Sequence, residues 1–182
     1  PLKWYKQNTH GGGVRDPLIV HWPGRLAEPG SLRTQFCHAI DIAPTVLAAI
    51  GIAQPTEVAC VPQMPVHGTS LLPTFGDAGA KVARGAQYFE MFGHRALVLD
   101  GWKAVSRHKA GTPYDEDVWE LYHLDRDFSE CRDLALTEPD RLQRMIALWW
   151  QEAEKHGVLP LDDRGASEMF RASQRPGMPT AR

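Results

Sequence analysis

The feature of this sequence that most constrains its fold is an amphipathic segment near the C-terminal end, residues 137–157. Thr137 is a suitable N-cap, Pro139 suits a first helical turn, and Gly157 is a typical helix stop. Apolar residues recur between these signals at three- and four-residue steps: Leu142, Met145, Ile146, Trp149 and Ala153. The pattern predicts one long helix that buries this stripe. The Trp149–Trp150 pair has a second interpretation as a stacking platform for sugars or bases, but aromatic residues on such a stripe more often pack in a core.

A β-like pattern precedes this helix. Short apolar runs alternate with turn signals between residues 86 and 124, which predicts an antiparallel meander. The strands are expected at residues 87–92, 95–99, 102–106 and 119–124. Together with the helix, this meander is expected to form a small α+β layer.

The first third of the chain has a different pattern. Leu18–Trp22 is a non-alternating apolar run, which suits a strand buried on both faces of an α/β sheet. A helix is expected from Asp41, as its N-cap, to Ile50, with Gly51 at its end.

The predicted fold class is therefore α/β plus α+β. The expected parts are the end of a larger α/β domain, a connecting loop region, a subdomain of antiparallel sheet and helix, and an extended tail. Their ranges are residues 1–52, 53–85, 86–164 and 165–182, respectively.

Composition and charge argue against several classes of function. A net charge of −2 with scattered basic residues provides no field for nucleic acid or an acidic membrane surface. The longest apolar stretches, such as residues 43–52, are too short for a transmembrane segment.

The cysteines, Cys37, Cys60 and Cys131, are odd in number and widely spaced. This favours free thiols in a reducing compartment, so a cytoplasmic location is slightly favoured.

Residues 10–13 (HGGG) match the loop that supplies oxyanion-hole amides in lipases and esterases. Such an enzyme also needs a G-x-S-x-G nucleophile elbow between a strand and a helix. The nearest sequence, residues 68–72 (GTSLL), lacks the second glycine, so an esterase is rejected. The sequence also contains no C-x-x-C pair and no H-E-x-x-H motif, so no metal ligands are predicted in this chain.

Segments along most of the chain match, in order, one known enzyme family. Residues 6–17 (KQNTHGGGVRDP) are followed by the apolar run 18–22 and by residues 41–45 (DIAPT). Later segments continue the series: HGTSLLP at 67–73, FEMFGHRA at 89–96, DGWK at 100–103 and WELY from 119. This series resembles the sulfatase family of the alkaline phosphatase superfamily, and its later part resembles the C-terminal region of bacterial arylsulfatases.

The resemblance implies both a fold and a reaction. The chain would form the last part of a sulfatase-like α/β sheet domain, followed by a small antiparallel sheet packed on a long helix. The full-length enzyme would hydrolyse a small-molecule sulfate ester. Lys6 corresponds to the family lysine that contacts the sulfate group, where a cation offsets the charge that develops on the oxygens. His10 is expected near the pocket rim as a second substrate-binding residue, and Gly11 replaces the usual Glu.

The same resemblance implies calcium and a formylglycine made from a C-x-P-x-R sequence in the full-length enzyme. Neither is provided by this chain. Residues 60–64 (CVPQM) have Met64 in the arginine position and lie downstream of Lys6 instead of far upstream. No catalytic residue is therefore assigned here, and the chain alone is expected to be inactive.

Two alternatives remain: an autonomous noncatalytic binding or assembly module derived from the sulfatase fold, and part of a related phosphonate or phosphodiester hydrolase. The chain begins at Pro1 without a signal-like segment, so we expect it to be part of a longer protein. A strand at 18–22 needs parallel neighbours from elsewhere. We therefore expect self-association or binding to the remainder of the sulfatase, and no nucleic-acid partner.

Overall fold

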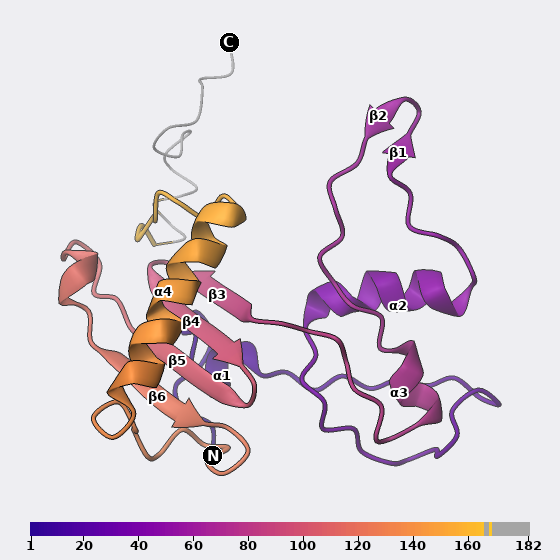
Figure 1. Ribbon diagram of the computed structural model, residues 1–182, viewed down its shortest axis with the longest axis horizontal. Helices are drawn as coiled ribbons and strands as arrows, with labels where there is room; N and C mark the ends of the chain where they lie inside the picture. Colours follow the sequence, from indigo (N-terminus) through magenta and orange to yellow (C-terminus); the bar gives the residue numbers. More distant parts are fainter. Residues whose placement is uncertain (166–167, 169–182) are drawn as a thin grey trace. The chain divides into compact units, whose positions relative to one another are not determined.

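The computed structural model describes residues 1–165 and 168, which divide into two compact units (Figure 1). The first unit contains residues 1–17 and the chain from residue 85 onward, and the second contains residues 18–84. The first 17 residues thus belong with the C-terminal sheet, and not with the segment up to residue 52 that the sequence grouped them with. Most of the expected tail, residues 165–182, lies outside the described residues.

The first unit is built on a four-stranded antiparallel sheet with the order β3–β4–β5–β6. Its strands are β3 (Gln87–Met91), β4 (His94–Leu99), β5 (Trp102–Ser106) and β6 (Trp119–His123). The pairs Met91–His94 and Leu99–Trp102 close hairpins through Phe92–Gly93 and Asp100–Gly101. All four turn residues have positive φ, as a type I′ turn requires. The expected meander is confirmed.

Helix α4 (Pro139–Lys155) packs on one face of this sheet (Figure 1). The main core joins its stripe to the sheet: Leu142, Met145, Trp149 and Ala153 pack with Leu97, Ala104 and Leu121. Ile146 packs at the edge of this cluster and is half-buried. The predicted stripe is confirmed, and Trp149 is a core residue instead of an exposed platform.

The start of α4 differs from the expectation. Glu138 takes the N-cap position and makes no side-chain capping bond. The hydroxyl of Thr137 donates instead to the carbonyl of Leu134, 3.1 Å away, in the turn before the helix. Thr137 therefore stabilises the approach to the helix and not its first amides.

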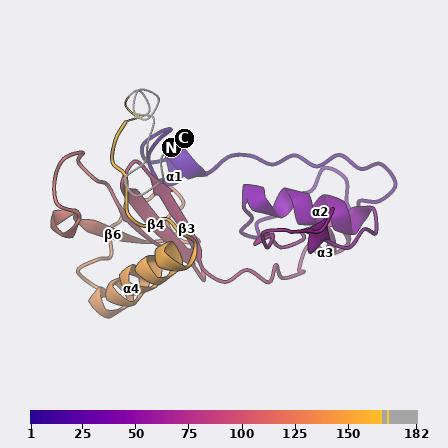
Figure 2. The same ribbon diagram turned by 90° about the horizontal axis from the view of Figure 1, so that it is seen from above.

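The N-terminal segment, with α1 (Gly11–Val14), covers the opposite face of the sheet from α4 (Figure 2). Side chains alternate between the faces of a strand, so the neighbours of the main-core residues point toward this segment. Ala96, Val105 and Tyr122 form a second buried cluster there. The short helix η2 (Tyr114–Glu116) lies in the connection from β5 to β6.

The second unit contains η1 (Ala39–Asp41), α2 (Ile42–Ala49), the hairpin β1 (Glu57–Val58) and β2 (Val61–Pro62), and α3 (Leu72–Gly76). Helix α2 confirms the helix expected from residue 41. Asp41 is fully buried and accepts hydrogen bonds from the amides of His38 and Thr69, at 2.8 and 2.7 Å. Its carboxylate also pairs with Arg84, so it joins three segments of this unit and does not cap α2 through its side chain.

Two expectations for this unit are corrected. Leu18–Trp22 forms no strand, and Leu18, Ile19 and Val20 are exposed. A strand buried on both faces needs paired neighbours, and every strand of the described residues pairs antiparallel within the two sheets already named. The region expected to be a connecting loop, residues 53–85, contains the β1–β2 hairpin and α3.

Candidate functional site

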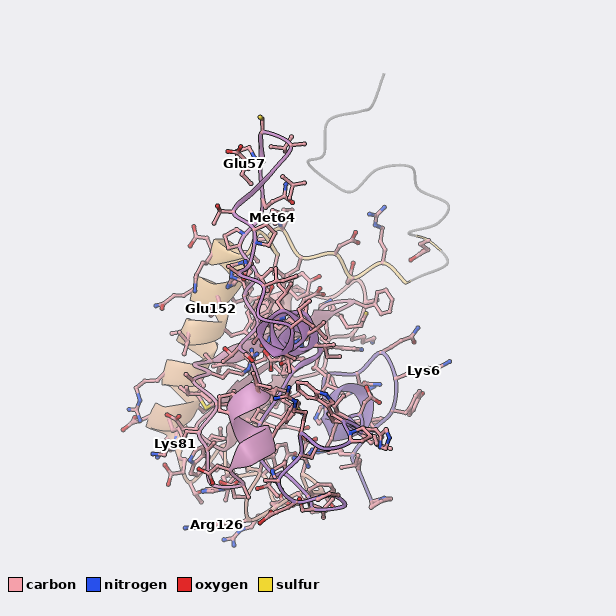
Figure 3. The ribbon with its side chains drawn as sticks, turned by 90° about the vertical axis from the view of Figure 1, so that its right-hand side faces the viewer. Lys6, Glu57, Met64, Lys81, Arg126 and Glu152 are labelled. Carbon is pink, nitrogen blue, oxygen red and sulfur yellow. The ribbon has the colours of Figure 1, made fainter. Side chains whose placement is uncertain are left out.

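The site is built around Lys6, which lies on the N-terminal segment of the first unit. Lys6 is exposed, and its side chain extends away from the body of the protein in Figure 3. Its ammonium makes no hydrogen bond or ion pair with the rest of residues 1–165. Trp4, two residues before Lys6, and Gln7, directly after it, have positive φ values of 60° and 74°, conformations that L residues rarely adopt. The lysine is thus presented on a tightly bent loop with its charge uncompensated.

The glycines hold this loop closed. The amide of Gly12 donates to the carbonyl of Lys3 at 2.8 Å. A Cβ atom at Gly12 would lie 1.9 Å from the carbonyl oxygen of Trp4, and one at Gly13 would lie 1.8 Å from that of Asn8. Both contacts are with backbone, so no larger residue fits without moving the loop. The close approach that the glycines permit is therefore an approach of the chain to itself, against the backbone of Trp4 before Lys6 and of Asn8 after it.

We expect Gly12→Ala to destabilise the first unit by about 3 kcal/mol, because the added methyl group overlaps a backbone carbonyl. Urea unfolding followed by far-UV circular dichroism measures the loss. Gly85→Ala is the matched control, since a Cβ atom there meets nothing within 4 Å. Equal stability of the Gly12→Ala and Gly85→Ala variants would contradict the packing described here.

Glu120 on β6 anchors the loop to the sheet. Its Oε2 accepts hydrogen bonds from Lys3 Nζ at 2.8 Å and from the Tyr122 hydroxyl, and it lies 3.0 Å from His10 Nε2. Burial alone would raise the pKa of Glu120, but the hydrogen bonds from His10, Lys3 and Tyr122 lower it to about 2. Glu120 is therefore a carboxylate near neutral pH, and burial together with this neighbouring charge raises the pKa of the Tyr122 hydroxyl.

His10 is not at a pocket rim, where it was expected. Its side chain is fully buried within this chain, where its Nε2 lies 3.0 Å from the Glu120 carboxylate. Its Nδ1 is also buried and has no hydrogen-bond partner among the described residues. The structure thus separates the two candidate residues: Lys6 points outward, whereas His10 supports the loop that carries it.

A second anchor lies under the first glycine. Glu130 Oε2 accepts a hydrogen bond from the Gly11 amide at 2.9 Å, and Oε1 pairs with Lys103 Nζ at 2.6 Å. Both side chains are almost fully buried. Burial lowers the pKa of Lys103, and the neighbouring Glu130 carboxylate counteracts that effect.

Sequence reasoning did not find Lys3, Glu120 or Glu130 as parts of this site. A partial signal was available for Glu120, since alternation along β6 places it on the same face as Tyr122. Nothing local indicated which segment would cover that face, because the partners are more than a hundred residues apart in the chain.

The residues present do not fit calcium or formylglycine. Within residues 1–165, no three His, Cys, Asp or Glu side chains come together in an arrangement that could hold a metal ion. Cys60 is exposed in the turn between β1 and β2, and Met64 occupies the position that the formylglycine motif gives to arginine. No described helix has the length and apolar character needed to cross a bilayer.

Comparison with known proteins decides the family. Residues 3–155 match the family model described as N-sulphoglucosamine sulphohydrolase, C-terminal. The chain belongs to this family. The resemblance to the C-terminal part of a sulfatase is thereby confirmed.

Relatives of this sulfatase C-terminal region include an uncharacterised sulfatase of Schizosaccharomyces pombe, 29% identical over 86% of the chain and 28% of the relative. Human N-acetylgalactosamine-6-sulfatase is 35% identical over 41% of the chain and 13% of its own length. The chain therefore spans less than a third of the length of these relatives.

Solved structures share the fold. The structure of Ps i-CgsB in complex with k-i-k-neocarrahexaose superposes with a TM-score of 0.64 at 24% identity, over 93% of this chain and 35% of the other. A protein from a Bacteroides thetaiotaomicron locus for glycosaminoglycan metabolism gives a TM-score of 0.58 at 22% identity, over 79% of this chain and 30% of the other. The mixed α/β architecture with its antiparallel sheet and long helix is thus that of sulfatase structures.

Proposed function

We propose that this chain is the C-terminal part of an arylsulfatase-type sulfuric ester hydrolase and that it contributes Lys6 as a sulfate-binding cation. The observation that carries the proposal is the uncompensated ammonium of Lys6, exposed on a loop that two glycines and Glu120 hold in place. A preorganised cation stabilises the charge that develops on sulfate oxygens as the ester bond breaks. His10 and Lys3 position this loop. The nucleophile and the metal ligands come from other residues of the enzyme, so this chain alone does not turn over sulfate esters.

In the complete enzyme, Lys6→Ala is expected to lower kcat/KM for an aryl sulfate by about a hundredfold, the usual effect of removing one oxyanion-stabilising group. Lys81→Ala is the control, because Lys81 is also exposed and lies in the other unit (Figure 3). A Lys6→Ala enzyme as active as the Lys81→Ala enzyme would overturn the role of Lys6. Faster hydrolysis of a phosphodiester or phosphonate ester than of the sulfate by the unaltered enzyme would assign it to that related class.

The second unit supports assembly with further sulfatase residues. Ile42, Val46 and Ile50 lie on one face of the α2 segment and are 48%, 53% and 60% exposed. Such a stripe normally packs against another element. We propose that the remainder of the enzyme covers it, which favours this function over an autonomous noncatalytic module.

The free, exposed cysteines are compatible with a cytoplasmic location, which stays a prediction.

The isolated chain is therefore expected to self-associate in solution. Light scattering coupled to size-exclusion chromatography should give a mass above that of one chain. A Val46→Lys, Ile50→Lys double variant should shift the mass to that of a monomer, because two charges on the stripe oppose its burial. A strictly monomeric unaltered chain would contradict the expectation, and the autonomous module would then gain support.

A further inference from the structure

Lys6 occupies the second position of a tight turn formed by residues 5–8. The backbone amide of Asn8 closes this turn by donating to the carbonyl of Tyr5 at 3.1 Å, and Asn8 Nδ2 donates to the same carbonyl at 3.2 Å. Gln7, in the third position, has a φ of 74°. A type II turn normally places glycine there, because an L side chain is strained at positive φ. Such a conformation persists only where surrounding contacts hold it.

Arg107 provides contacts on both sides of the turn. Its guanidinium carbon lies 3.6 Å from the centre of the ring of Trp4, the residue directly before the turn. Its Nε donates to Oδ1 of Asn8, the last residue of the turn, at 3.1 Å. One planar side chain therefore bridges the two ends of the turn that presents Lys6. Stacking and an aligned Nε–H bond both use the plane of the guanidinium group, which a lysine side chain does not have.

The backbone of Arg107 is itself firmly placed on the sheet. Arg107 directly follows β5, and its neighbours Ser106 and His108 are both buried. Ser106 Oγ donates to the carbonyl of Val118 at 2.9 Å, and the His108 amide donates to His94 Nδ1 at 2.9 Å. No carboxylate of the described residues lies within ion-pair distance of Arg107. Its contacts with the loop therefore orient its guanidinium group.

We propose that Arg107 is a positioning residue, which holds the turn so that the Lys6 ammonium is already oriented when a sulfate group arrives. A cation held in place needs no reorganisation as charge develops on the sulfate oxygens, whereas a mobile turn has to be ordered first. The inference rests on the proposed function and adds to it a residue that acts through Lys6 without touching the substrate.

In the complete enzyme, Arg107→Lys is expected to lower kcat/KM for an aryl sulfate about tenfold, because a displaced catalytic group loses much of its effect. Arg107→Gln should cause a similar loss, since both variants lack the guanidinium plane. Unaltered activity of Arg107→Lys would overturn the inference, because positive charge alone would then be sufficient.

A second substitution tests whether Arg107 acts through Lys6. In a Lys6→Ala background, Arg107→Lys should change kcat/KM by less than about twofold, because the group that Arg107 positions is no longer present. A further tenfold loss in that background would contradict the proposed route of action.

Arg141→Lys is the matched control. The guanidinium carbon of Arg141 lies 4.2 Å from the centre of the Trp102 ring, so this variant also loses an arginine stacked on an indole. Arg141 belongs to α4, which packs on the face of the sheet opposite the N-terminal segment. The Arg141→Lys enzyme is expected to keep the kcat/KM of the unaltered enzyme.

Amide hydrogen exchange provides a measurement that does not require activity. Peptides covering residues 4–13 should exchange about tenfold faster in Arg107→Lys than in the unaltered enzyme or in Arg141→Lys, because the turn opens more often. Unchanged exchange overturns the inference whatever the activity. Loss of activity in Lys6→Ala but not in the Arg107 variants overturns the inference alone, whereas full activity of Lys6→Ala overturns the proposed role of Lys6 and the positioning role with it.

Discussion

Replacing Glu130 with alanine is expected to lower the free energy of unfolding by about 3 to 5 kcal/mol, the usual cost of removing one partner of a buried ion pair. The substitution leaves the Lys103 ammonium without its carboxylate in a position that is almost fully buried. It also removes the acceptor of the Gly11 amide. Urea unfolding followed by far-UV circular dichroism measures the difference.

A double substitution separates the lost pair from general damage to the core. Lys103→Met combined with Glu130→Leu removes both charges, so we expect it to be less destabilising than Glu130→Ala alone. A double variant less stable than Glu130→Ala would contradict the proposed cause, which is an uncompensated buried charge.

The destabilisation should also depend on pH. Burial already lowers the pKa of Lys103, and loss of the Glu130 charge removes an effect that raises it. In Glu130→Ala the folded protein therefore releases this proton at a lower pH than the unfolded chain does. Stability rises with pH wherever the unfolded state binds more protons, so the deficit of the variant should shrink as pH increases toward the ordinary pKa of lysine. If the difference in unfolding free energy between the unaltered protein and Glu130→Ala did not change with pH, Lys103 would not be its source.

The second large loss of stability is expected on substitution of Trp149. Trp149→Ala should cost about 3 to 5 kcal/mol, as deletion of a large aromatic side chain from a core usually does. The ring is fully buried, and it meets Trp119 and Trp150 edge-on at centroid distances of 6.4 and 5.0 Å. Its Nε1 donates to the carbonyl of Phe89 at 3.0 Å, which ties α4 to β3. The loss is measured from urea unfolding by circular dichroism.

Trp149→Phe divides this effect into its parts. It keeps an aromatic ring in the core but removes the donor to Phe89, so its stability should lie between those of the unaltered protein and Trp149→Ala. Leu136→Ala provides the control, because Leu136 is almost fully exposed and its truncation should change stability by less than about 0.5 kcal/mol. A Trp149→Ala protein as stable as Leu136→Ala would exclude Trp149 from the core.

Local patterns predicted the elements of the first unit well. The hairpin turns at Phe92–Gly93 and Asp100–Gly101 connect strands only two residues apart, so both the turn and its flanking alternation are visible in a short window. The stripe of α4 is equally local, since a helix repeats every 3.6 residues. Tertiary packing decided the details, such as the N-cap at Glu138 in place of Thr137.

The same reasoning failed where an element depends on distant partners. Leu18–Trp22 has the composition of a buried strand, yet composition cannot provide the neighbours that such a strand must pair with. His10 carries no local sign of burial, because it is the Glu120 carboxylate, 110 residues away, that holds it under the loop.

The sequence alone predicted the antiparallel sheet, the long helix, the resemblance to the family and Lys6 as the candidate cation. Turns, helical periodicity and ordered motifs can all be recognised in the linear sequence. Only the tertiary structure revealed how that cation is presented. The N-terminal loop is held by Glu120 and Glu130, which join it across more than a hundred residues. The segments that pack together are those that bury both faces of one sheet at the same time. This requirement concerns the whole fold, and no single stretch of the sequence contains it.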